Sequence, residues 1–173
     1  MIVAGGDGTL NEALQGIQNF EQIRLGYLPA GSSNDLARDL QLSGTAKQQL
    51  VWLLDHGKER RVDLGCLHWM EGETPQKRYF AVSCGIGYDA AVCQEALDSP
   101  IKDRLNRIGL ESFLSRIGLK QMLTLRFQKA SVRLDGIEVV HASRLLFAAS
   151  MIRRFEGGGF CFCPQADDQD GLL

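Results

Sequence analysis

The stretch Val3-Ala4-Gly5-Gly6-Asp7-Gly8-Thr9-Leu10-Asn11-Glu12 decides the fold of this chain. Residues 1–4 form a short apolar run stopped by glycine, which predicts the end of a buried strand. From Thr9 onward, apolar residues recur at positions 10, 13, 14 and 17, the spacing of one helical face. Thr9 and Glu12 also have capping-box spacing, so we expect the helix to begin at Thr9.

Three glycines and one aspartate lie between this strand and this helix. Glycines allow a sharp turn with exposed backbone N–H groups, and the helix N-terminus behind them carries partial positive charge. This combination predicts a phosphate-binding turn. It is not a Walker loop, because no G-K-[ST] sequence is present. It is not a dinucleotide fingerprint either, because Asn11 stands where the third glycine belongs.

Asp7 indicates the kind of phosphate chemistry. A carboxylate among phosphates is repelled unless it serves a metal ion or accepts a proton from a nucleophile, which suits phosphoryl transfer better than hydride transfer. The alternative is an ordinary strand–helix turn in which Asp7 caps locally.

Four stretches together resemble the catalytic domain of the diacylglycerol kinases, a family that includes bacterial lipid kinases and the related sphingosine and ceramide kinases. The stretches follow the order of the family and span essentially the whole chain. They are 5–12 (GGDGTLNE), 28–38 (LPAGSSNDLAR), 85–90 (GIGYDA), and 157–173 with its glycine triplet, CPQA and DGLL. Ser32 is a mild departure, since the family usually has threonine there.

Composition excludes several other classes of protein. The chain has 173 residues, is 45% hydrophobic and carries a net charge of −2, so nothing suggests a nucleic-acid partner. Its longest nearly apolar run, 145–152, is too short to span a bilayer. Cys161 and Cys163 would share one face of a strand, as a metal pair or as reduced core cysteines. The five cysteines show no CxxC spacing, and we expect a cytoplasmic protein.

The rest of the first 60 residues continues the α/β pattern. A strand over 24–29 and the turn Ser32-Ser33-Asn34-Asp35 precede a second helix, with Ser32 or Ser33 as its cap. Thr45 and Gln48 form a capping box for a third helix that ends at His56-Gly57, with Ala46, Leu50, Leu53 and Leu54 expected inward.

The character of the sequence changes near residue 60. Strands are predicted over 62–67, 78–83, 130–134, 137–141 and 143–151, with Asp135-Gly136 as a two-residue hairpin turn. Residues 100–128 are predicted to be helical, and 153–159 a mobile loop whose arginines meet solvent, phosphate or lipid. The expected fold is an incomplete Rossmann-like α/β nucleotide-binding part (1–60) followed by a partial β-rich, sandwich-like second domain (61–173), a two-domain lipid-kinase architecture.

The resemblance implies which residues bind ATP. The nucleotide-binding residues would come from the first two turns and are Gly5, Gly6, Asp7, Gly8, Thr9, Leu10, Asn11, Glu12, Ser32 and Asn34. Asp7 is the catalytic candidate: it would hold the catalytic Mg²⁺, position the acceptor or accept its proton.

The acidic run Asp167-Asp168-Gln169-Asp170-Gly171 offers the oxygen ligands that Mg²⁺ prefers. From the residues alone, a solvated acidic turn is the simpler interpretation. Carried over from the resemblance, the ligands of a structural Mg²⁺ are the Asp170 side chain and the carbonyls of Asp167 and Leu172. Asp89 would belong to a water-linked network near that metal, or would cap its helix.

The resemblance implies a kinase that transfers the γ-phosphoryl group of ATP to a lipid hydroxyl, diacylglycerol first among them. We expect peripheral contact with the inner face of the membrane and a homodimer. The family also has segments before Met1 and after Leu173, including a catalytic carboxylate, so we expect a chain truncated at both ends that is weakly active or inactive alone. The rivals are a soluble-substrate kinase similar to NAD kinases and a non-catalytic nucleotide-binding module.

Overall fold

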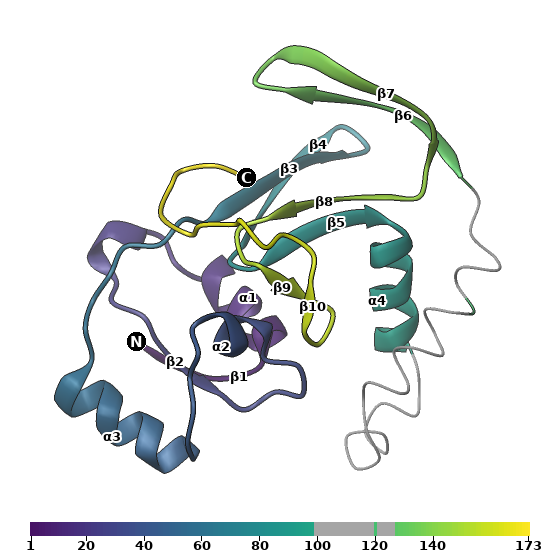
Figure 1. Cartoon of the computed structure of the whole chain (residues 1–173). Helices are drawn as coiled ribbons and strands as arrows, with labels where there is room; N and C mark the ends of the chain where they lie inside the picture. The colour runs from purple at the N-terminus through teal and green to yellow at the C-terminus, as the bar shows by residue number, and fades with distance from the viewer. Residues whose placement is uncertain (99–119, 121–126) are drawn as a thin grey trace. The chain divides into compact units, whose positions relative to one another are not determined.

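The computed structural model describes residues 1–98, 120 and 127–173 (Figure 1). The described chain divides into two compact units, Met1–Cys84 with Ser150–Leu173, and Gly85–Ala149. The first unit contains both turns of the predicted nucleotide site and the C-terminal acidic run. The assignment of 1–60 and 61–173 to two family domains is not tested by this division and stays a prediction.

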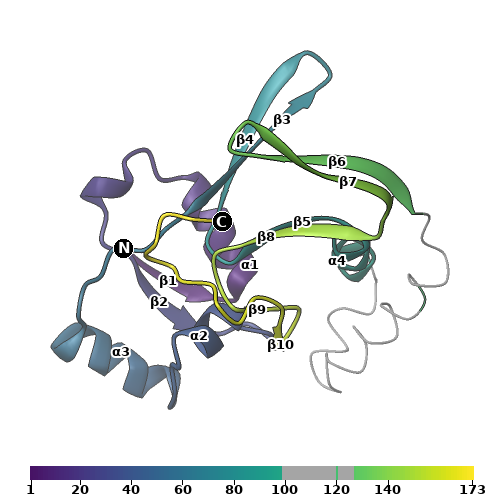
Figure 2. The same ribbon diagram turned by 45° about the horizontal axis from the view of Figure 1, so that its top comes forward.

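The first unit begins with a strand–helix–strand motif. Strand β1 (Ile2–Gly5) pairs in parallel with β2 (Gly26–Pro29), and helix α1 (Asp7–Gln15) and the short 3-10 helix η1 (Phe20–Gln22) lie between them in sequence. Figure 2 shows β1 and β2 side by side. The predicted strand and helix are confirmed, but the start of the helix was wrong: α1 begins at Asp7, with Gly6 as its extended N-cap.

A hydrophobic core of described residues packs around this motif. Leu10 and Leu14 are 2% and 3% exposed, as the helical spacing predicted. The other buried members come from the two strands, the segment after α1, helix α2 and the segment after β4. They are Val3, Ile17, Tyr27, Leu36, Ala37, Ala81 and Val82. Burial of this apolar surface is the main force that holds the two turns of the candidate site in place.

Two further helices follow β2. Helix α2 (Asp35–Asp39) starts directly after the second turn. Helix α3 (Ala46–His56) has the predicted capping box between Thr45 and Gln48 and ends before Gly57. The prediction of its inward-facing residues is confirmed only in part. Leu50 and Leu53 are partly buried, whereas Leu54 is 68% exposed. A sheet of two strands offers a helix little surface to pack on.

The first unit also contains a hairpin of β3 (Gly65–Glu71) and β4 (Thr74–Phe80). The two strands pair antiparallel, from Gly65 opposite Phe80 to Glu71 opposite Thr74. Gln15 joins α1 to this hairpin: its amide nitrogen donates to the carbonyl of Tyr79 and its amide oxygen accepts from the N–H of Tyr79, both at 2.9 Å. Helix α1 is therefore fixed on the side away from its N-terminus.

The second unit contains helix α4 (Tyr88–Asp98) and a long hairpin of β6 (Gln128–Leu134) and β7 (Ile137–Leu145). Asp135 and Gly136 both have positive φ, 50° and 77°, which confirms the predicted two-residue turn. Strands β5 (Ser83–Gly87) and β8 (Phe147–Met151) pair with each other and carry the chain out of the first unit and back. The helix predicted over 100–128 lies almost entirely outside the described residues, and Gln128 begins β6.

After the second unit, the chain forms a short hairpin in the first unit. Its strands are β9 (Phe155–Glu156) and β10 (Phe160–Cys161), of two residues each. Its connection is Gly157–Gly159, called the glycine loop below, and all three residues have positive φ. Among the described helices, none combines the length and the apolar character needed to cross a bilayer.

Candidate functional site

The N-terminus of α1 is open. No side chain caps it, and Gly8 and Thr9 in its first turn are exposed. A Cβ built on Gly8 would meet no atom within 4 Å, whereas one built on Gly5 would lie 2.5 Å from the Cβ of Thr9. Thr9 therefore packs against Gly5 instead of capping the helix. The first-turn N–H groups of α1 therefore have no side-chain partner at the cap, and an uncapped helix N-terminus of this kind favours an anion such as phosphate.

Asp7 does not cap its own helix. Its Oδ2 accepts a hydrogen bond from the backbone N–H of Asp35 at 2.8 Å, and its Oδ1 accepts one from Leu36 at 3.2 Å. The alternative of a local cap by Asp7 is thus wrong, because Asp7 caps α2, the next helix. Neither Ser32 nor Ser33 caps α2 as expected, because Asn34 occupies the N-cap position and Asp7 supplies the carboxylate from a distance.

The two turns touch through glycine. A Cβ on Gly31 would lie 2.4 Å from the Cα of Gly6, so the backbones approach more closely than any other residue allows. Asn34, in a left-handed conformation with φ 50°, closes the second turn: its Oδ1 accepts from the N–H of Gly31 at 2.9 Å and its Nδ2 donates to the carbonyl of Gly31 at 2.6 Å. Ser32 is exposed at the rim.

The remaining predicted nucleotide residues face away from this opening or are engaged in packing. Leu10 is in the core, Asn11 accepts a hydrogen bond from the N–H of Ala81 at 3.4 Å, and Glu12 forms an ion pair with Arg78 on β4. Asn11 and Glu12 thus help to dock α1 on the chain around β4. The residues placed at the opening are Gly6, Asp7, Gly8, Thr9 and Ser32.

The sequence analysis did not predict two titratable residues next to the turns, Asp35 and Tyr27. Asp35 is 4% exposed, and burial raises the pKa of its carboxyl, followed by the negative charge of Asp7, although a hydrogen bond from Gly158 opposes this. Tyr27 lies on β2, and burial, then the charges of Asp7 and Asp35, raise the pKa of its hydroxyl. The signal for Asp35 was its place directly after Asn34 in the second turn.

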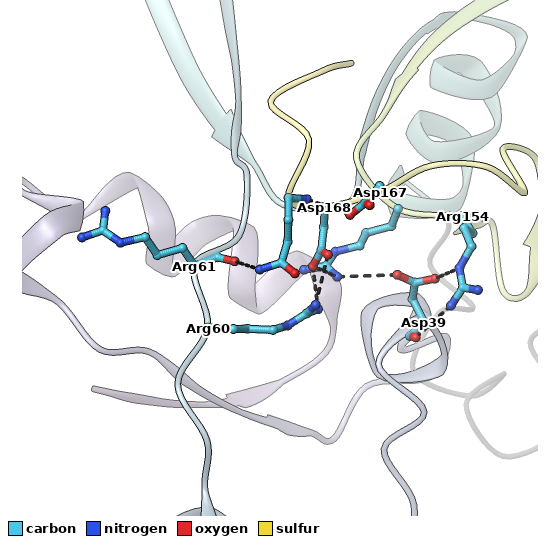
Figure 3. A network of polar contacts seen from close by, with 8 residues as sticks. Asp39, Arg60, Arg61, Arg154, Asp167 and Asp168 are labelled. Atoms are coloured by element: carbon cyan, nitrogen blue, oxygen red, sulfur yellow. Dashed lines mark hydrogen bonds and ion pairs between the residues drawn. The ribbon is translucent and has the colours of Figure 1, made fainter.

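A network of arginines and aspartates ties the C-terminal segment to α2 (Figure 3). Arg60 donates to both carboxylate oxygens of Asp168, at 3.1 and 2.6 Å, and the buried Arg153 pairs with the same carboxylate. Asp39 at the end of α2 pairs with Arg153 at 3.5 Å and with Arg154 at 2.7 Å. Burial lowers the pKa of Arg153, but its two aspartates oppose this. The expected mobile loop thus begins with a buried, ion-paired arginine.

The predicted structural metal site is an exposed turn beside this network. Asp170 Oδ1 accepts from the N–H of Leu172 at 2.9 Å, Asp167 Oδ1 from Gln169 at 3.0 Å, and Asp63 Oδ2 from Gly171 at 2.8 Å. In the part of the chain that the structure describes, no three His, Cys, Asp or Glu residues are grouped to hold a metal ion. The predicted set has one carboxylate and two carbonyls, so it stays a prediction.

The other metal candidates from the sequence are Asp89 and the pair Cys161 and Cys163. Asp89 falls in α4 of the second unit, and its side chain lies outside the described part of the structure. Cys161 is exposed and Cys163 is partly buried, and both are free thiols. The expectation that they are core cysteines is therefore wrong for Cys161, because β10 is a two-residue strand whose side chains are exposed.

Comparison with known proteins decides the family. Residues 1–67, which carry both turns, match the family model of the diacylglycerol kinase catalytic domain. This part of the chain belongs to the diacylglycerol kinase catalytic-domain family. The resemblance stated from the four stretches is thereby confirmed.

Relatives in the diacylglycerol kinase family match the whole chain. A diacylglycerol kinase of Mycobacterium tuberculosis is 30% identical over 176 residues, and one of Bacillus subtilis is 26% identical over 177 residues. Each match takes in all of this chain and 52% of the relative, so the chain spans about half the length of these relatives.

A solved structure shares the fold. The crystal structure of a diacylglycerol kinase from Bacillus anthracis aligns with 98% of this chain and 50% of its own, with a TM-score of 0.64 and 22% identity. This likeness supports an α/β N-terminal part and a β-rich remainder. The Rossmann-like layering and the sandwich stay predictions.

Proposed function

We propose that this chain carries the nucleotide-binding part of an ATP-dependent lipid kinase, which transfers the γ-phosphoryl group to a lipid hydroxyl. The observation that carries the proposal is the uncapped N-terminus of α1, where Gly8 and Thr9 are exposed and the glycines Gly6 and Gly31 let the two turns approach closely. Backbone N–H groups and the helix dipole there favour phosphate oxygens.

Asp7 is the first residue of α1, and its carboxylate is held by two backbone N–H groups of α2. These bonds fix its orientation. A carboxylate accepts more than two hydrogen bonds, so Asp7 keeps capacity for a metal-bound water or for the acceptor hydroxyl. The residues therefore fit Mg²⁺, which would neutralise phosphate charge when bound. The contribution of the chain is to place the phosphates and to orient Asp7.

Diacylglycerol is the proposed acceptor because the relatives that match the whole chain include proteins named diacylglycerol kinase. A lipid acceptor implies contact with a membrane surface, and we propose peripheral binding at the inner face of the membrane for the protein. The homodimer and the structural Mg²⁺ at Asp170 remain part of this proposal. Because the chain spans about half of each relative, the proposed activity belongs to the whole enzyme.

The test offers the chain γ-labelled ATP, Mg²⁺ and mixed micelles that hold diacylglycerol, monoacylglycerol, phosphatidylglycerol and ceramide. NAD in solution provides a soluble acceptor. Label in diacylglycerol that is absent with Asp7→Asn supports the proposal. Label in NAD instead favours the soluble-substrate rival.

A binding control separates catalysis from nucleotide recognition. Affinity for Mg·ATP is measured by calorimetry on the wild-type chain and on Asp7→Asn. Binding without transfer, with the variant unchanged in affinity, favours the non-catalytic module. The absence of both binding and transfer in the folded chain contradicts the proposal.

A further inference from the structure

The glycine loop is attached to the second turn by one side chain. The backbone N–H of Gly158 donates to Asp35 Oδ2 at 2.9 Å, across 123 positions of sequence. All three glycines have positive φ, 67°, 89° and 112°, which lets successive N–H groups converge on one anion. The carboxylate of Asp35 is the anion that this loop holds.

Asp35 also reaches the candidate catalytic carboxylate. Its own backbone N–H is the donor to Asp7 Oδ2, at 2.8 Å. The chain of contacts thus runs from the N–H of Gly158 to the side chain of Asp35, and from the backbone of Asp35 to Asp7. Every member lies in the first unit. Asp35 therefore links the glycine loop to Asp7.

The glycine loop lies against the second turn and α2. A Cβ on Gly158 would be 3.7 Å from Ser33 Oγ in the second turn, and one on Gly159 would be 2.8 Å from the guanidinium carbon of Arg38. The second turn in turn touches Gly6 through Gly31. Three segments distant in sequence therefore meet around the start of α2.

Burial argues that Asp35 does more than pack. The residue is 4% exposed, its Oδ1 has no hydrogen-bond partner among the described residues, and the nearest cation, Arg38 Nε, is 3.9 Å away. A buried carboxylate with an unsatisfied oxygen is costly to stability. A neutral residue of similar volume at position 35 would make the folded protein more stable than a buried carboxylate does.

We propose that Asp35 is a positioning residue of the nucleotide site, which holds the glycine loop against the second turn and thereby orients Asp7. This inference rests on the proposed function for its meaning in catalysis, but the contact it describes is testable without activity. Asp35 does not touch the reacting atoms; it acts through Gly158 and Asp7.

The first experiment compares Asp35→Ala with Asp35→Asn. The alanine removes the side-chain acceptor for Gly158, whereas the asparagine keeps an acceptor oxygen, and both variants keep the backbone N–H that donates to Asp7. We expect hydrogen exchange at the Gly158 amide to speed up by about tenfold or more in the alanine variant and much less in the asparagine variant. We expect the affinity for Mg·ATP to fall about tenfold in the alanine variant, the loss of one charge-assisted hydrogen bond. The asparagine variant should recover most of it.

Leu14→Ala is the matched control for loss of stability. Leu14 lies in the same core, 3% exposed, but makes no polar contact with either turn. It should lower the free energy of unfolding without changing the affinity of the folded protein for Mg·ATP. Equal loss of affinity in Leu14→Ala and Asp35→Ala would overturn the positioning role.

A titration of the wild-type chain keeps the inference testable where Asp35→Ala does not fold. The titratable and charged groups facing the Asp35 carboxyl are Asp7, Tyr27 and Arg38. The chemical shift of the Gly158 amide should follow the protonation of Asp35, a step absent in Asp35→Asn. A flat Gly158 profile, or Gly158 exchange equal in all three chains, would overturn the inference. Loss of exchange protection together with no ATP binding by the wild type would instead contradict the proposed function alone.

Discussion

The carboxylate of Asp7 accepts a hydrogen bond from the backbone N–H of Asp35 at 2.8 Å, so the first residue of one helix caps the next. The contact joins two turns that are 28 positions apart in sequence. It gives Asp7 a structural task in addition to the catalytic one proposed for it, and the two tasks make separate predictions.

Asp7→Asn should destabilise the chain by about 1–2 kcal/mol, because an amide offers one acceptor oxygen where the carboxylate offers two. Chemical denaturation measures this change in the free energy of unfolding. Asp55→Asn, at an exposed position of α3, is the control and should stay within about 0.5 kcal/mol of the wild type. If both variants lose less than about 0.5 kcal/mol of unfolding free energy, the Asp7 carboxylate does not stabilise α2.

Two glycines of the turns should respond differently to substitution by alanine, because a Cβ on Gly31 would collide with Gly6 whereas one on Gly8 would meet open space. Gly31→Ala should cost about 2–3 kcal/mol, because its Cβ would lie 2.4 Å from the Cα of Gly6. Gly8→Ala should be neutral or stabilise by up to about 1 kcal/mol, because it lies in α1 and its Cβ would meet nothing within 4 Å. Thermal unfolding of the two variants checks the contrast, and similar losses would contradict this account of the two turns.

Much of the local structure could be predicted from the sequence. Short-range signals determine the strand–helix start, the capping box of α3 and the turn at Asp135-Gly136. The cap of α1 could not be predicted, because Thr9 has the right spacing but packs against Gly5. Contacts between distant residues leave no such signal.

The site itself was predicted in part. The two turns are brought together as the motifs indicated, and Gly8, Thr9 and Ser32 lie exposed there. The role of Asp35 depends on Gly158, 123 positions away, and no spacing rule connects them. The same holds for Arg153, whose partners Asp39 and Asp168 come from different segments of the chain.

Asp168→Asn should destabilise the chain by about 3–5 kcal/mol, because it leaves the buried guanidinium of Arg153 without its closest counter-charge. The neighbouring Asp167→Asn is the matched control. Asp167 is exposed and, among the described residues, accepts from the N–H of Gln169, so its substitution should change stability by less than about 0.5 kcal/mol. Equal effects in urea denaturation would show that the network contributes little.

The pH dependence of stability should report Asp35. Burial raises the pKa of its carboxyl above 3.8, so the folded state binds this proton more tightly than the unfolded state does. The contribution of Asp35 to stability therefore falls as pH rises from 3.8 through the raised pKa. The free energy of unfolding is measured for the wild type and for Asp35→Asn across this pH range. As pH rises, the wild type should lose stability relative to the variant. A shift in favour of the wild type would mean that the folded pKa is lowered instead.

The most direct test of the candidate site is a titration of the isotope-labelled chain with Mg·ATP, followed through its backbone amide resonances. The account predicts saturable shifts of Gly8 and Thr9, at the open N-terminus of α1, and weaker binding by the folded Gly8→Ala variant. Unchanged Gly8 and Thr9 resonances at millimolar nucleotide, or shifts confined to residues outside the two turns, would contradict it.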